Sequence, residues 1–67
     1  MAALFDIFSV RSGEPRWLGA ADTVLKALVL AVHEGEGLYF VFSPANGHKQ
    51  FYKVGADGTV ERGASTE

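Results

Sequence analysis

The sequence predicts an α+β fold, in which one helix packs on one face of an antiparallel four-stranded sheet. Three observations support this prediction. Four segments are rich in β-branched and aromatic residues, and short turns containing glycine or proline separate them within each pair. One stretch, residues 24–32, has apolar residues at helical spacing. Capping residues border that stretch, with Asp22 or Thr23 before it and Gly35 after it.

The strands follow from composition and from the turns between them. We expect strands at residues 4–10, 16–20, 38–43 and 48–54, with a possible short fifth strand at residues 59–62. A loop at residues 44–47 places Phe40 opposite Phe51 and Tyr39 opposite Tyr52. A right-handed crossover through the helix makes strands two and three parallel, and strand one fills the gap between them. The predicted sheet order is therefore 2-1-3-4.

The length of the chain indicates one domain that needs additional stabilisation. We expect a single α+β domain at residues 1–62 and a flexible C-terminal tail at residues 63–67. A domain of this size buries only about 60% of the surface that its unfolded chain exposes. The chain has no cysteine for disulfides, and its two histidines are too few for a structural zinc site. The remaining means of stabilisation are oligomerisation or an unusually efficient core.

Charge and hydropathy argue against nucleic acid and membranes as partners. The formal net charge of −2 gives no general attraction to nucleic acid or to an anionic membrane. Residues 1–6 lack the basic and apolar regions of a signal peptide. The apolar run at residues 24–32 contains Lys26 and is far shorter than the roughly 20 residues of a membrane span. We expect a cytoplasmic protein.

The third strand is apolar at five successive positions, so both faces of the sheet are apolar there. We place the helix over the face that carries Leu38, Phe40, Phe42 and Phe51. The second face carries Tyr39, Val41, His48, Gln50 and Tyr52. Either Phe5 and Ile7 or Phe8 and Val10 join this second face from strand one. We expect it to pack against another copy of the chain. A C-terminal hairpin folded over it, a ligand or a foreign protein are the alternatives.

The helix offers a further contact region. Its apolar face is broad, and Ala27 and Ala31 extend it on one side, while Leu30 lies on the polar side. The two alanines are either good helix formers at a boundary or contacts with a second subunit. The candidate interface residues are Tyr39, Val41, Gln50, Tyr52, Ala27, Leu30 and Ala31. A homodimer is the favoured assembly.

No residue pattern indicates catalysis, a cofactor or a metal. His33-Glu34-Gly35-Glu36 lacks the second histidine of a helical zinc motif. Ser43 and His48 lack an orienting acid and an oxyanion site. We therefore expect a non-catalytic protein–protein interaction module rather than an enzyme.

Nucleic-acid binding is the alternative function. Lys49 and Lys53 alternate with Phe51 near Phe40 and Phe42, and sheets that bind single strands combine aromatic and basic side chains. The expected place of these aromatics under the helix, and the negative net charge, argue against it.

Three segments carry a resemblance to other proteins: Phe5-Asp6-Ile7-Phe8, Trp17-Leu18 and Leu38-Tyr39-Phe40-Val41-Phe42 with Gly47. They consist of hydrophobic and turn patterns and lie within roughly residues 4–49. In these segments the chain resembles a loose group of short uncharacterised bacterial proteins with the element order β-β-α-β-β. The resemblance implies this fold, but no known activity and no catalytic residue.

Overall fold

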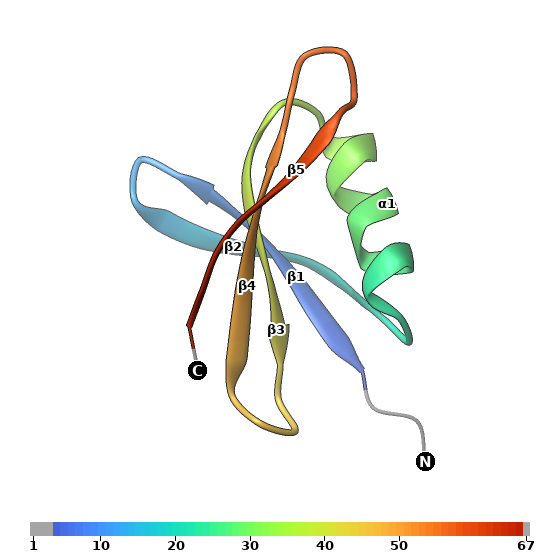
Figure 1. The fold of residues 1–67 in the computed structure, drawn as a ribbon, viewed down its shortest axis with the longest axis vertical. Helices are drawn as coiled ribbons and strands as arrows, with labels where there is room; N and C mark the ends of the chain where they lie inside the picture. Colours follow the sequence, from blue (N-terminus) through green and yellow to red (C-terminus); the bar gives the residue numbers. More distant parts are fainter. Residues whose placement is uncertain (1–3, 67) are drawn as a thin grey trace.

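One helix lies against one face of a five-stranded antiparallel sheet in the computed structural model, which describes residues 4–66 (Figure 1). The elements are β1 (Phe5–Arg11), β2 (Glu14–Ala21), α1 (Val24–Glu34), β3 (Gly37–Ser43), β4 (His48–Val54) and β5 (Val60–Thr66). The strand order β2-β1-β3-β4-β5 confirms the predicted α+β fold, its sheet order and the fifth strand. The parts of the domain and tail predictions that concern residues 1–3 and 67 lie outside the described residues.

The first hairpin turn is tighter than expected, and β2 therefore begins earlier. Ser12 and Gly13 have φ values of 54° and 76°, and Arg11 pairs with Glu14 across them. Positive φ at both central residues is typical of the two-residue type I′ turn, whose twist matches that of the flanking strands. Pro15 consequently lies inside β2, where it is tolerated because β2 is an edge strand.

The predicted hairpin between β3 and β4 is confirmed residue by residue. Phe40 pairs with Phe51 and Tyr39 with Tyr52, and the loop at residues 44–47 joins the strands. Gly47 has a φ of 70°, and its N–H donates to the carbonyl oxygen of Ser43 at 2.8 Å. Glycine adopts this left-handed conformation without steric cost, so the loop sequence itself sets the register.

The helix begins and ends where its capping residues predict. Thr23 is the N-cap, and its Oγ1 accepts a hydrogen bond from the backbone N–H of Lys26 at 3.1 Å. Asp22 instead forms an ion pair with the Lys26 side chain, at 3.2 Å. At the other end, the N–H of Gly35 donates to the carbonyl oxygen of Ala31.

The helix covers the opposite sheet face from the one predicted. The buried core consists of Ile7, Ala27, Ala31, Tyr39, Val41 and Val54, with Phe5 packed against it. The helix therefore covers the Tyr39 and Val41 face, and β1 contributes Phe5 and Ile7 to that face. The prediction that α1 packs on Leu38, Phe40, Phe42 and Phe51 is wrong. The physical reason is that Lys49 and Lys53 share the phenylalanine face, and buried ammonium groups are costly without partners.

The Tyr39 hydroxyl satisfies its own hydrogen-bonding requirement inside this core. It donates to the carbonyl oxygen of Gly35, at the end of α1, at 2.6 Å. A tyrosine can be fully buried when its hydroxyl finds such a partner. Burial, together with the Glu34 carboxylate, raises the pKa of Tyr39 above its ordinary value of 10.0, while Arg11 acts in the opposite direction.

Strand β5 continues through residues that were predicted to be a flexible tail. Gln50 pairs with Ser65 and Lys49 with Thr66, so the tail prediction is wrong for residues 63–66. The buried Gln50 amide explains the extension, because its Nε2 donates to the carbonyl oxygens of Gly63 and Ala64 at 2.8 and 3.1 Å. These bonds hold β5 where its pairing with β4 is irregular, between Gln50 and Tyr52.

The packing of α1 predicts that Ala31→Leu destabilises the fold. Ala31 has no exposed surface, and added methylenes in a filled core cost about 1–3 kcal/mol. Urea unfolding followed by circular dichroism measures the loss. Ala45→Leu, in an exposed loop, is the matched control. Equal stabilities of the two variants would contradict the packing described above.

The Tyr39 hydrogen bond predicts a pH-dependent difference between the wild type and Tyr39→Phe. At about pH 8 the variant should be less stable by about 1 kcal/mol, because the bond to Gly35 is lost. The raised pKa keeps the folded-state hydroxyl protonated where the unfolded-state hydroxyl ionises, so wild-type stability declines as the pH rises above about 10.

The stability difference between wild type and Tyr39→Phe should accordingly narrow between about pH 8 and pH 10.5 in urea unfolding. Tyr52→Phe removes the other tyrosine hydroxyl of the chain and serves as the control. A difference that stays constant over this range would show that Tyr39 does not titrate differently in the two states.

Candidate interaction surfaces

A row of four aromatic side chains crosses the sheet face opposite α1. The register places Trp17 on β2 beside Phe8 on β1, Phe8 beside Phe40 on β3, and Phe40 beside Phe51 on β4. The Phe8 and Phe40 rings are stacked with their centroids 4.8 Å apart, and the Phe40 and Phe51 centroids are 5.3 Å apart. Such cross-strand aromatic contacts stabilise neighbouring strands. We call these residues the aromatic row and the sheet face that carries them the open face.

Four charged side chains flank the aromatic row on the open face. Asp6 and Lys49 both pair with Phe42, on opposite sides of β3. On the other side of the row, Lys53 pairs with Leu38 and with Glu61. With two acidic and two basic groups, these four positions carry no net charge. Charge thus does not prevent two copies of this face from meeting.

Two of the charged groups contact the aromatic row directly, one at its end and one at its centre. Trp17 Nε1 donates to Asp6 Oδ1 at 3.2 Å, which fixes the indole beside β1. The Lys49 ammonium lies over the Phe40 ring, 5.1 Å from its centroid, in a cation–π contact. The contact of Trp17 with Asp6 is on the exposed surface, whereas the Lys49 side chain helps to cover Phe40, which is buried.

The open face is apolar, and no other element within residues 4–66 covers it. Phe40 is only 7% exposed because its neighbours in the row shield it, whereas Trp17 is 57% and Leu38 is 43% exposed. The helix contacts the opposite face, where the buried core lies. Contiguous apolar surface of this kind commonly marks an interaction site.

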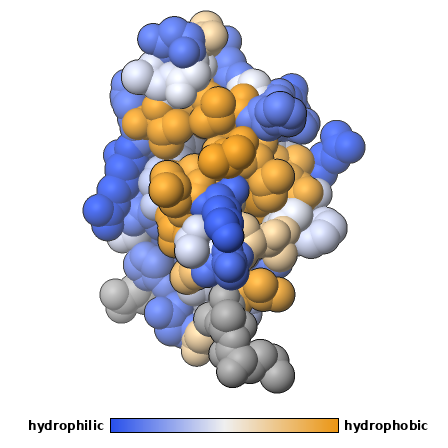
Figure 2. Space-filling view, turned by 90° about the vertical axis from the view of Figure 1, so that its right-hand side faces the viewer, coloured by the Kyte–Doolittle hydropathy of each residue, from blue (hydrophilic) through white to orange (hydrophobic). Residues whose placement is uncertain are grey.

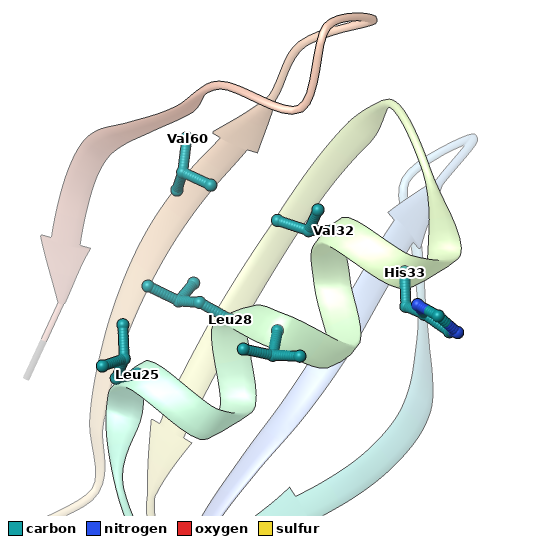
Figure 3. A pocket seen from close by; sticks show the side chains of 6 residues that line it. Leu25, Leu28, Val32, His33 and Val60 are labelled. Carbon is teal, nitrogen blue, oxygen red and sulfur yellow. The ribbon is translucent and has the colours of Figure 1, made fainter.

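A second apolar surface lies between α1 and the start of β5. A groove of about 360 Å³ is lined by Leu25, Leu28, Val29, Val32, His33 and Val60. Figure 2 shows the broad hydrophobic surface on this side of the molecule. In Figure 3, side chains of α1 and Val60 of β5 border the same space, while His33 points away at the end of the helix. We call this surface the helix groove.

The turn before β5 positions Val60 in this groove. Gly58 has a φ of 86°, and the N–H of Gly55 donates to the carbonyl oxygen of Thr59 at 2.8 Å. The Asp57 carboxylate accepts hydrogen bonds from the hydroxyl and the N–H of Thr59. Both bonds lower the pKa of Asp57, and the bond from the Thr59 hydroxyl has the larger effect. Because hydrogen bonds within residues 55–59 fix the conformation of the turn, Val60 approaches the helix at a defined position.

The structure places most of the predicted interface residues inside the molecule. Tyr39, Val41, Ala27 and Ala31 belong to the buried core, so their side chains cannot form an outer contact surface. The alanines are buried because their small size lets the helix approach the sheet closely. The prediction that these four residues form an interface therefore does not fit the fold.

The other three predicted interface residues lie at the margins of the core. Gln50 is buried and bonds to β5, and Tyr52 is partly buried against the core. Leu30 is 37% exposed and packs toward Gly19. A Cβ added at Gly19 would lie 3.1 Å from the Cδ1 atom of Leu30. These three residues do not combine into one exposed patch with the others.

The prediction from sequence does not identify the aromatic row as an interface between copies, because it places Phe40 and Phe51 under the helix and leaves the side of Phe8 undecided. The signal that identifies it is the alternation of Lys49 and Lys53 with Phe51. Two lysines on one side of a strand indicate that this side faces solvent. Phe51 shares that side, and the register then brings Phe40 and Phe8 with it.

The remaining candidate groups from the sequence are Ser43 with His48 and the run His33-Glu34-Gly35-Glu36. Ser43 and His48 pair across the hairpin, and the hydrogen bond seen at His48 within residues 4–66 is a donation from its backbone N–H to Asn46 Oδ1 at 3.0 Å. Within residues 4–66, no three histidine, aspartate or glutamate side chains gather where they could hold a metal ion. Among the same residues, α1 is too short to cross a membrane, and no other helix is present.

Comparisons with protein-family models, with curated proteins and with solved structures give no match to this chain.

Proposed function

We propose that the protein is a small non-catalytic interaction module that associates with a second copy of itself through the open face. The observation that carries the proposal is the aromatic row, which lies on a sheet face that no described element covers. In a chain of 67 residues without cysteine, association is also the available route to additional stability. The proposed location is the cytoplasm, in keeping with the lack of cysteine.

The dimensions of the open face suit a dimer. The molecule measures 35 × 21 × 19 Å, so a rectangle that encloses its broadest side has an area on the order of 700 Å², which is an upper limit for the flat area of the open face. Stable interfaces of standard size bury about 800 Å² on each partner. Nearly the whole open face would therefore take part, including the exposed Trp17 and Leu38.

The composition of the open face also suits self-association. Its centre is aromatic and its margin carries balanced charges, which is the usual anatomy of a protein interface. Trp17 is a large side chain that remains 57% exposed, and buried tryptophans are among the strongest contributors to association. The helix groove is comparably apolar, but it lacks a comparable charged margin. His33 is the one residue of its lining that can carry a charge.

The proposal predicts that Leu38→Glu prevents association and that Leu25→Glu does not. Both leucines are exposed, at 43% and 74%, so the free chain should tolerate either charge. Leu38 lies on the open face and Leu25 in the helix groove. Burying the new carboxylate between two copies costs desolvation free energy that its cross-strand neighbour Lys53 only partly offsets, so the dissociation constant of Leu38→Glu should rise by at least about tenfold.

Analytical ultracentrifugation at tens of micromolar measures this effect, and circular dichroism checks that both variants fold. Trp17, the single tryptophan, reports independently, because its fluorescence should shift to shorter wavelength as the dimer forms. A wild type that stays monomeric with an intact fold would exclude self-association. Disruption by Leu25→Glu alone would assign the contact to the helix groove instead.

Nucleic-acid binding is a second candidate, favoured by one specific contact. Lys49 lies over Phe40, and Lys53 stands on the same face, so stacking rings and basic groups occur together. Proteins that bind single strands use this combination. Asp6 and Glu61 on the same face oppose it, which is why self-association is preferred.

The second candidate predicts affinity for a labelled single-stranded DNA of about 12 nucleotides that falls steeply with salt. Fluorescence polarisation at low salt measures it. Lys49→Ala should weaken binding and reduce the salt slope by about one, whereas Lys26→Ala, on the far side of the helix layer, should not. An absence of binding at low salt would remove this candidate.

A further inference from the structure

The arrangement of charges on the open face distinguishes between the ways in which two copies can meet. A closed dimer through one surface is isologous, so a two-fold axis must lie in the plane of contact. We consider the aligned class of sheet packing, in which the strands of the two sheets lie about 30° apart, rather than the orthogonal class. The axis consequently runs either across the strands or along them, and each choice sets different residues against each other.

An axis across the strands brings like charges together. It would set each strand against the same strand of the partner, with the two copies of the strand running in opposite directions. When the axis passes over the aromatic row, Phe51 of β4 lies midway between Lys49 and Lys53, so each Lys49 would face the partner's Lys53. Such a juxtaposition of like charges in an interface is strongly unfavourable.

An axis along the central strand β3 brings opposite charges together. The order β2-β1-β3-β4-β5 then sets β1 against the partner's β4 and β2 against the partner's β5. Asp6 and Lys49 stand at the same level, because both pair with Phe42. Asp6 therefore meets the partner's Lys49, and the two-fold symmetry provides this pair twice.

The aromatic row is self-complementary about the same axis. Phe8 and Phe51 both pair with Phe40, so Phe8 of each copy meets the partner's Phe51. Trp17, one strand further out, lies over the part of the partner's β5 that contains Gly63. A Cβ at Gly63 would stand 3.7 Å from that of Phe51, so the glycine leaves room for the indole beside the row.

We infer that the protein forms a sheet-to-sheet dimer whose two-fold axis runs along β3, with Asp6 of each copy paired to the partner's Lys49. The inference rests on the proposed self-association and specifies its geometry. It identifies the partner as a second copy because the same face supplies both members of each charge pair and both members of each aromatic contact.

Charge reversal with mixing tests the geometry. Asp6→Lys and Lys49→Glu, each alone, place like charges at both pairs and should weaken the dimer by about tenfold or more. In an equimolar mixture of the two variants, the heterodimer restores both pairs with opposite charges. The mixture should therefore regain nearly wild-type association, measured by native mass spectrometry and sedimentation at the same total concentration.

Two controls separate the interface from effects within one chain. Asp6→Asn keeps an acceptor for Trp17 but removes the charge, so it should weaken the dimer less than Asp6→Lys does. Asp22→Lys and Lys26→Glu reverse an ion pair on the exposed helix surface, outside the open face, and should leave association unchanged alone and mixed. Thermal unfolding verifies that each variant folds.

The outcomes separate a failure of this geometry from a failure of the proposed self-association. Recovery of the heterodimer supports the axis along β3. Single variants that associate like the wild type, or a mixture that fails to recover, would overturn this axis while the wild-type dimer still stands. A wild type that is monomeric by sedimentation would overturn the proposed self-association first.

Discussion

The close approach of α1 to the sheet through Ala27 and Ala31 is the contact on which the rest of the structure depends. Both side chains are fully buried, and their small size brings the helix down onto Ile7 and Tyr39. The Tyr39 hydroxyl then reaches the carbonyl oxygen of Gly35 at the end of the same helix. This contact defines the inner face of the sheet, and so it also determines which side chains remain outside.

The residues left outside stabilise one another without closing the surface. Phe40, at the centre of the aromatic row, is nearly buried between Phe8, Phe51 and the Lys49 side chain. The exposed area remains at Trp17 and Leu38 instead. The open face thus resembles half of a core: it is organised enough to keep its shape in a single chain, and apolar enough to gain from a partner.

The open face and the helix groove differ in what they can recognise. The groove is lined by aliphatic side chains, with His33 as its one titratable group, so its surface specifies little beyond shape. The open face combines aromatic rings with charges of both signs at defined positions. Charges at fixed positions select one orientation of a partner and disfavour others. This difference is why the proposed contact involves the sheet.

Local signals in the sequence were sufficient for most of the fold. The capping residues around α1 and the loop at residues 44–47 each act within a few residues, and they correctly predict the helix and the β3–β4 register. The handedness of the crossover then leads to the sheet order. The length of β5 was not predictable in this way, because the Gln50 amide bonds to Gly63 and Ala64 only after β5 lies beside β4.

The sequence by itself determined which residues share a face of the sheet, because side chains alternate along every strand. It separated Tyr39 and Val41 from Phe40 and Phe42 correctly. Only the tertiary structure decided which of these two faces lies under the helix. That choice depends on how Ala27 and Ala31 pack on Ile7 and Tyr39, and on keeping two lysines in solvent. The packing of the alanines is a property of the assembled layers, whereas the lysine positions are already visible in one segment, as the alternation of Lys49 and Lys53 with Phe51.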